Sequence, residues 1–223
     1  MGNKLAILGG DFLLARASIA LASLRDPDVI EMLARVIEHL VTGEVMQMTA
    51  KEDRRTSFDY YKRKTYYKTA SLVANSARAV AALGGHSAPV ADDAYAYGKH
   101  VGLAFQFVDD YLDYTSSSYL LGKPAGNDLR QGIATAPVLF AAEERPELNQ
   151  LIRRKFKEPG DVERALEAVQ ATDGLERTRL LAAEHAAAAV AALERLPPTA
   201  SAEALVARQA LVSITERVLS RRK

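Results

Sequence analysis

Three aspartates close together on one predicted helix are the strongest chemical signal in the sequence. Asp109, Asp110 and Asp113 lie in the run FQFVDDYLD. Residues four apart share a helix face, so Asp109 and Asp113 are expected to be neighbours, with Asp110 to one side. Carboxylates in the middle of a helix repel one another and gain nothing from the dipole at a helix start. Mg²⁺ is the natural cation to compensate them, because it takes oxygen ligands and shares its coordination shell with substrate phosphates.

A solvated acidic helix face is the alternative interpretation of this cluster. The neighbouring Phe105, Val108 and Leu112 are apolar, which indicates that much of this helix is buried. Buried carboxylates need partners, so the apolar neighbours favour a metal site over a solvated face. The pair Asp92-Asp93 differs, because it follows Pro89 in a first helical turn, where negative charge is favourable without any ligand.

Cationic and polar side chains elsewhere in the chain could hold a diphosphate. Lys123 follows Asp113 by ten residues, in a Gly-Lys-Pro turn from which a lysine can reach a phosphate as a point charge. Lys68-Thr69 lies at the edge of an apolar run and is the pair we predict to contact the diphosphate. Several of the cations between residues 62 and 68 are predicted to face solvent. Glu44 and Gln47, one helical turn apart, are expected to line the same cavity.

Helical periodicity runs through the whole chain, and no alternating strand pattern bounded by hairpin turns is present. Pro27 and Pro89 are predicted to lie just inside helices, and Ser57 to cap one. No repeat or linker divides the chain, so residues 1–223 are predicted to form a single all-α domain. The predicted helices cover residues 3–24, 27–50, 57–84, 89–117, 133–155, 160–171, 174–196 and 201–220, and residues 115–132 form a loop.

Composition narrows the class of protein. The chain has 223 residues, no cysteine and a net charge of +1. The absence of cysteine excludes disulfides and thiolate metal sites, and the near-neutral charge argues against a nucleic-acid partner. No uninterrupted apolar run approaches the ~20 residues of a membrane span, so no transmembrane segment is predicted. The basic tail at residues 221–223 is predicted to be solvated, and Asp11, inside an apolar helix, to be buried and paired.

Taken together, these motifs resemble those of the trans-isoprenyl diphosphate synthases, in the order and near the spacing of that family. The segments around residues 66–72 and 132–137 are similar in particular to the eukaryotic long-chain enzymes, of the solanesyl or decaprenyl type, that make ubiquinone tails. The resemblance rests on the segments GDFLL (10–14), GE with Gln47 (43–47), KTASL (68–72), FQFVDDYLD (105–113) and GKPAGNDL (122–129).

The resemblance implies an isoprenoid synthase-type helical bundle that condenses an allylic diphosphate with isopentenyl diphosphate into a long all-trans polyprenyl diphosphate. In such enzymes the diphosphate departs with metal assistance, and the isopentenyl double bond attacks the resulting carbocation. By resemblance, Asp109, Asp110 and Asp113 bind Mg²⁺ as the second aspartate-rich motif of the family. Lys68, Gln106 and Lys123 match residues that hold the allylic diphosphate, Thr69 one beside the leaving group, and Phe105 one near isopentenyl diphosphate.

The sequence departs from the family pattern in two places. Ile133 stands where many short-chain members have a lysine, and the first aspartate-rich motif is absent together with the upstream segment that grips isopentenyl diphosphate. We therefore expect a truncated bundle that lacks its N-terminal helices and is inactive alone. The intact protein is expected in the mitochondrion, or alternatively in a plastid, with its targeting peptide not present in this chain.

Two other functions fit parts of the same pattern. The chain could be a non-catalytic partner subunit, since family members pair as homodimers or as mixed oligomers with a related subunit. It could also be a class I terpene cyclase, which shares a helical fold and an aspartate cluster. The intact Asp109–Asp113 cluster counts against the first alternative, and the 68–69 and 122–129 segments count against the second.

Overall fold

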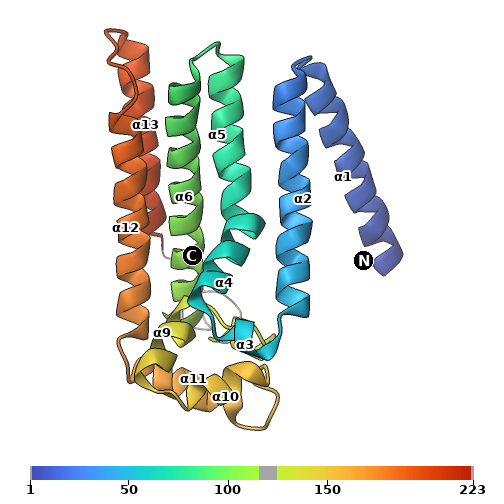
Figure 1. Ribbon diagram of the computed structural model, residues 1–223, viewed down its shortest axis with the longest axis vertical. Helices are drawn as coiled ribbons and strands as arrows, with labels where there is room; N and C mark the ends of the chain where they lie inside the picture. The colour runs from blue at the N-terminus through green and yellow to red at the C-terminus, as the bar shows by residue number, and fades with distance from the viewer. Residues whose placement is uncertain (1, 116–124, 222–223) are drawn as a thin grey trace.

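Long helices lie side by side and shorter ones gather towards one end of the bundle (Figure 1). The computed structural model describes residues 2–115 and 125–221, and within them it contains helices and no strand, which confirms the all-α prediction. The long helices are α1 (Asn3–Ser23), α2 (Pro27–Thr49), α5 (Ser71–Leu83), α6 (Ala88–Thr115), α12 (Gly174–Glu194) and α13 (Ala202–Leu219). The short ones are α3 (Glu52–Arg55), α4 (Phe58–Thr65), α8 (Asn127–Arg130), α9 (Ala136–Glu144), α10 (Leu148–Arg153) and α11 (Asp161–Gln170).

Side-chain caps start two helices, α2 and α4, where the sequence predicts them. Asp26 accepts a hydrogen bond from the Val29 amide at 3.0 Å, immediately before Pro27 in the first turn of α2. Ser57 caps α4 in the same way, with the Tyr60 amide at 3.2 Å. The predicted helix over 133–155 is wrong, because the chain breaks into α9 and α10. The residue before Pro146 is driven out of helical geometry by the proline ring, which explains the break.

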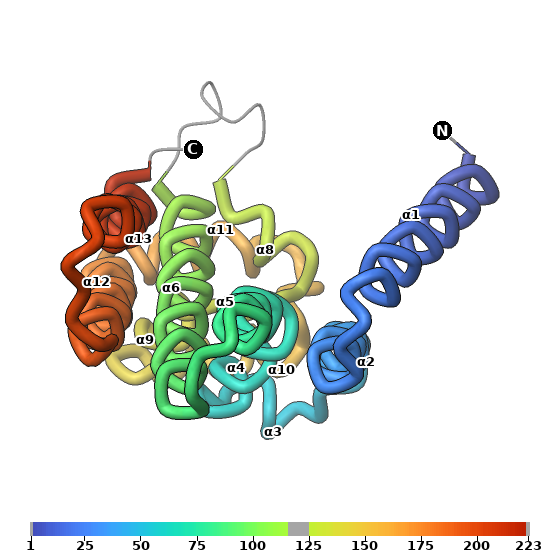
Figure 2. Tube along the Cα trace, turned by 90° about the horizontal axis from the view of Figure 1, so that it is seen from above, coloured from blue at the N-terminus to red at the C-terminus, as the bar shows by residue number. Residues whose placement is uncertain are grey.

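Helix α6 runs through the middle of the molecule and packs against α5 and α12 (Figure 2). Its C-terminal half joins the main hydrophobic core, in which Phe107, Leu129, Leu148 and Ile152 are almost completely buried. Gly102 lets α6 approach its neighbour closely, since a Cβ there would lie 2.7 Å from the Cα of Ala70. This close contact fixes the chain around Ala70 relative to α6.

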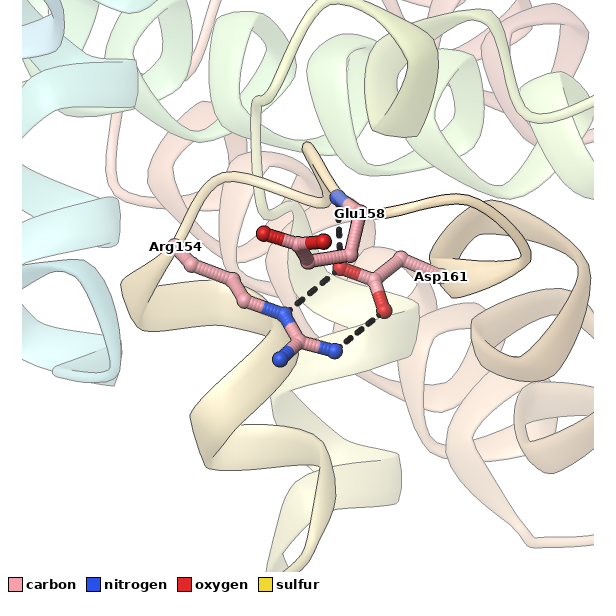
Figure 3. A network of polar contacts seen from close by, with 3 residues as sticks. All are labelled: Arg154, Glu158 and Asp161. Atoms are coloured by element: carbon pink, nitrogen blue, oxygen red, sulfur yellow. Dashed lines mark hydrogen bonds and ion pairs between the residues drawn. The ribbon is translucent and has the colours of Figure 1, made fainter.

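An ion pair holds the turn between α10 and α11 (Figure 3). Asp161 is 1% exposed and accepts hydrogen bonds from Arg154 Nε at 2.7 Å and Nη2 at 2.5 Å. The backbone amide of Glu158 donates to the same carboxylate at 3.2 Å. These hydrogen bonds hold the pKa of Asp161 below its usual value, with the guanidinium of Arg154 as the main cause. The network therefore holds α10 and α11 together at one end of the bundle (Figure 1).

Helix α1 projects away from the bundle and buries none of its residues (Figure 2). The prediction that Asp11 is buried is wrong, because α1 packs against no part of the described chain that could cover it. Apolar side chains of this helix are exposed, among them Leu5, Ile7 and Phe12 at 54%, 65% and 64%. Exposed apolar surface of this extent is typical of a face that another subunit or segment covers.

The prediction that the chain has no transmembrane segment rests on the absence of an unbroken apolar run. Within the described residues, α1 is long and apolar enough to cross a membrane, judged by length and composition alone. The prediction required an unbroken apolar run, whereas average hydropathy tolerates isolated charges such as Asp11 and Arg16.

Candidate functional site

A turn of π-helix, η1 (Tyr66–Ala70), carries Lys68 and Thr69 between α4 and α5. The sequence predicts one uninterrupted helix over 57–84, but the structure inserts this wider turn. Such turns interrupt helices frequently at functional sites, where they redirect side chains. The Lys68 ammonium group donates a hydrogen bond to Gln47 Oε1 at 3.1 Å and forms an ion pair with Glu44 Oε1 at 2.8 Å. Lys68 is thereby oriented by two side chains of α2.

A chain of hydrogen bonds links Thr69 to the acidic helix. The Thr69 hydroxyl donates to Gln106 Oε1 at 2.9 Å, and the Gln106 amide donates to Asp110 Oδ1 at 2.8 Å. The Tyr61 hydroxyl donates to the second oxygen of Asp110. Asp110 is 2% exposed, so this carboxylate is both buried and satisfied by neutral donors. The arrangement fixes Thr69, Gln106 and Asp110 relative to one another.

These side chains surround a polar cavity of about 220 Å³. Four residues predicted to act in the site, Lys68, Thr69, Gln106 and Asp110, line it together, although they come from η1 and α6. Gln47 also lines the cavity as expected, whereas Glu44 reaches it through its contact with Lys68. The structure therefore brings half of the predicted site residues to one place.

The three aspartates of α6 lie in three different environments. Asp110 faces the cavity, whereas Asp109 pairs with Arg221 Nη2 at 2.5 Å on an exposed side of the helix. Asp113 accepts hydrogen bonds from the backbone amides of Asn127 at 3.2 Å and Asp128 at 3.1 Å, at the start of α8. Within the described ranges, no three His, Asp or Glu side chains form a group that could hold a metal ion. The predicted ligands are thus close along the helix but not preassembled around one point.

Asp128 is an acidic cavity residue to which the sequence prediction gave no role. Asp113 holds the start of α8 through its amide contacts, and this places Asp128 in the cavity with Asp110. Burial, and then repulsion from Asp110 and Asp113, raises the pKa of Asp128 to about 7. Burial similarly raises the pKa of Asp110 to about 6, against the hydrogen bonds from Tyr61 and Gln106. Two carboxylates share a confined space in which their negative charge is poorly solvated.

Lys64 is a cavity residue to which the sequence prediction gave no role. It is 9% exposed and lines the cavity with Lys68, and burial lowers the pKa of its ammonium group. The spacing of Tyr61, Lys64 and Lys68 by three and four residues puts them on one helix face. That spacing is the signal that could have identified Lys64, but the charged neighbours at 62 and 63 obscured it.

The remaining predicted residues lie outside the cavity or outside the described chain. Phe105 is 40% exposed and packs under Arg221, whose guanidinium carbon lies 4.2 Å from the ring centroid. The prediction that the basic tail is solvated is therefore wrong for Arg221, which contacts both Phe105 and Asp109. Lys123 lies outside the described residues.

Comparison with known proteins gives one consistent match. A family model described as "Polyprenyl synthetase" matches residues 1–169. The rice (Oryza sativa subsp. japonica) protein named solanesyl-diphosphate synthase 1, mitochondrial, is 52% identical over 223 residues, covering 100% of this chain and 52% of that protein. The chain spans about half the length of the curated relatives it matches.

Solved structures share the fold. A medium/long-chain length prenyl pyrophosphate synthase from Arabidopsis, in its apo form, superimposes with a TM-score of 0.92 at 49% identity, over 100% of this chain and 75% of that one. A polyprenyl synthase from Caulobacter crescentus CB15, solved with calcium and isoprenyl diphosphate, has a TM-score of 0.86 at 34% identity, covering 100% and 67% of the two chains.

Proposed function

Because the chain belongs to the polyprenyl synthetase family, we propose that its cavity binds the metal complex of an allylic diphosphate for transfer of the prenyl group to isopentenyl diphosphate. The observation that carries this proposal is the meeting of Lys68 and Thr69 with the buried Asp110 and Asp128 around one cavity. Cations and hydroxyls suit phosphate oxygens, and buried carboxylates suit the metal that accompanies them.

The donor set of the cavity fits a hard divalent cation such as Mg²⁺. Its acidic ligands are oxygens. Burial raises the pKa values of Asp110 and Asp128, and repulsion from Asp110 and Asp113 raises that of Asp128 further. Mg²⁺ usually binds through one or two carboxylates together with substrate phosphates and water, so three preassembled ligands are not required. Mg²⁺ held by Asp110, with Asp109 and Asp113 on the same stretch of α6, would supply neutralising charge for the departing diphosphate.

The chain's own residues position the diphosphate and hold the leaving group. Lys68, oriented by Glu44 and Gln47, offers its ammonium group to phosphate oxygens. Thr69 is held by Gln106, so its hydroxyl stays at a defined place beside the leaving group. Preorganised donors of this kind lower the barrier because they need no rearrangement when charge develops. Phe105, which precedes Gln106 on α6, is proposed to lie near isopentenyl diphosphate.

We assign the complete protein to long-chain polyprenyl diphosphate synthesis for quinone side chains. The rice relative is named as a mitochondrial solanesyl-diphosphate synthase, and this supports a long product and a mitochondrial location, with a plastid as the alternative. The exposed apolar face of α1 supports assembly with a second subunit, as a homodimer or as a mixed oligomer. The non-catalytic partner-subunit function remains the second candidate because of this exposed face.

Prenyl transfer tests the proposal directly. The purified chain is incubated with radiolabelled isopentenyl diphosphate, an allylic primer and Mg²⁺, alone and after mixing with a complete homologous subunit. Long-chain labelled product that disappears when Asp110 is changed to Asn supports the assignment. If the mixture forms product equally well with the Asp110→Asn variant of this chain, the result supports the partner-subunit function instead. If the chain adds no product in either sample, the result argues against both functions.

A further inference from the structure

Lys64 occupies an unusual position for a lysine. It lies one helical turn before Lys68, at the end of α4, and the two side chains line the same cavity as Asp110 and Asp128. Only 9% of the residue is exposed to solvent. Lysine is almost never buried to this degree unless its charge is paired.

The ammonium group of Lys64 has no such partner among the described residues, where it makes neither a hydrogen bond nor an ion pair. Its neighbours on the same segment behave differently, since Lys62 pairs with Asp59 at 3.0 Å and Lys68 with Glu44 at 2.8 Å. Lys64 Nζ lies over the ring of Tyr61, 5.3 Å from its centroid. A buried charge in this state is costly to the folded protein.

The charges around Lys64 show what could satisfy it. Asp110 and Asp128 act on it electrostatically, but each is also pushed towards its neutral form by burial. Ile133 lines the same cavity and contributes no charge. An anion that enters the cavity with its metal would meet two lysines one helical turn apart. Lys64 is the one of the two whose donors are not already engaged.

We infer that Lys64 is a further diphosphate-binding residue of this site, whose ammonium group contacts the phosphate oxygens together with Lys68. This inference rests on the proposed function and adds a residue to it. Ile133 contributes no charge to the cavity, so Lys64 on α4 is the second lysine, after Lys68, that lines it. Lys64 is held at the cavity with little exposure to solvent and without an ion-pair partner in the described part of the chain. This arrangement destabilises the folded protein but places the ammonium group for a phosphate before the anion binds.

Calorimetric titration of inorganic diphosphate in the presence of MgCl₂ tests the inference. The Lys64→Met variant is expected to bind diphosphate about tenfold or more weakly, as loss of a charge-assisted hydrogen bond requires. Lys64→Arg should retain most of the affinity, because it keeps the charge. Lys62→Met is the matched control on the same helix, and its affinity should equal that of the wild type.

Thermal melting without ligand distinguishes binding from a structural role. Removal of an unpaired buried charge should leave the melting temperature of Lys64→Met equal to or above that of the wild type. The inference is wrong if Lys64→Met binds diphosphate as tightly as the wild type. It is also wrong if Lys64→Met and Lys64→Gln both melt, without ligand, well below the wild type. If the folded wild type itself fails to bind diphosphate, the proposed function fails and the assignment of Lys64 fails with it.

Discussion

Replacement of Gly102 by alanine should separate α6 from η1 and thereby disturb the site. A Cβ at position 102 would lie 2.7 Å from the Cα and 3.1 Å from the Cβ of Ala70. Ordinary carbon contacts are about 3.5–4.0 Å, so the two segments must move apart by about 1 Å. Both sides of the contact are backbone or close to it, and no flexible side-chain end can turn aside.

The cost of this change follows from two opposing effects. Overpacking of a tight contact costs about 1–3 kcal/mol, and the rigid neighbour favours the upper part of that range. Alanine in a helix gains about 1 kcal/mol over glycine. The net loss is about 1–2 kcal/mol, which lowers the melting temperature of a chain of this size by roughly 2–8 °C. Ala70 follows Thr69, so the 2.9 Å hydrogen bond from Thr69 to Gln106 should also be disturbed.

Urea and thermal unfolding of Gly102→Ala and Gly10→Ala measure the effect. Gly10 is the matched control, because a Cβ there meets nothing within 4 Å and the same gain in helix propensity applies. We expect Gly102→Ala to be less stable than the wild type and Gly10→Ala to be at least as stable. Equal stability of the two variants would refute the close approach of α6 to η1.

Two further predictions concern contacts away from the cavity. His100 Nδ1 and His185 Nδ1 are 2.9 Å apart between α6 and α12, and burial lowers the pKa of His185 to about 4. Because its folded pKa is depressed, stability should fall between about pH 6.5 and 4, and this fall should be smaller in His185→Gln. The raised pKa values of Asp110 and Asp128 make stability rise as the pH falls, which opposes the effect of His185. The quantity to measure is therefore the difference in the pH dependence of stability between the wild type and His185→Gln. Asp161→Ala, which leaves Arg154 without its buried partner, should lower the melting temperature clearly. Glu176→Ala breaks an exposed pair with Arg179 and should change the melting temperature little. Equal effects of the two substitutions would contradict the role of the network around Asp161.

Local chemistry explains which parts of the fold could be predicted from the sequence. Capping residues and prolines predict the starts of α2 and α4 well, because their side chains act on backbone groups a few residues away. The break at Pro146 follows from the same local rules, although the apolar periodicity that continues across it predicts one uninterrupted helix. The projection of α1 depends on what packs against it, and its own apolar periodicity cannot specify this.

The cavity itself was only partly predictable for a related reason. Lys68, Thr69, Gln106 and Asp110 stand out by type and spacing, and the structure brings them together. The π turn at η1 has no simple sequence signature, and it rotates the residues beyond it relative to an ordinary helix. Asp128 acquires its role from burial and from neighbours distant in sequence, and the spacing of Lys64 does not by itself show that its side chain is buried.

Diphosphate binding by this chain with and without Mg²⁺ tests the central claim most directly. Calorimetry should show binding of inorganic diphosphate in MgCl₂, no measurable binding in EDTA, and at least tenfold weaker binding for Asp110→Asn, which removes a proposed metal ligand. Asp92→Asn is the control, because Asp92 pairs with Arg78 away from the cavity and its loss should leave the affinity unchanged. Diphosphate binding that is equally tight in EDTA, or unaffected by Asp110→Asn, would contradict the account.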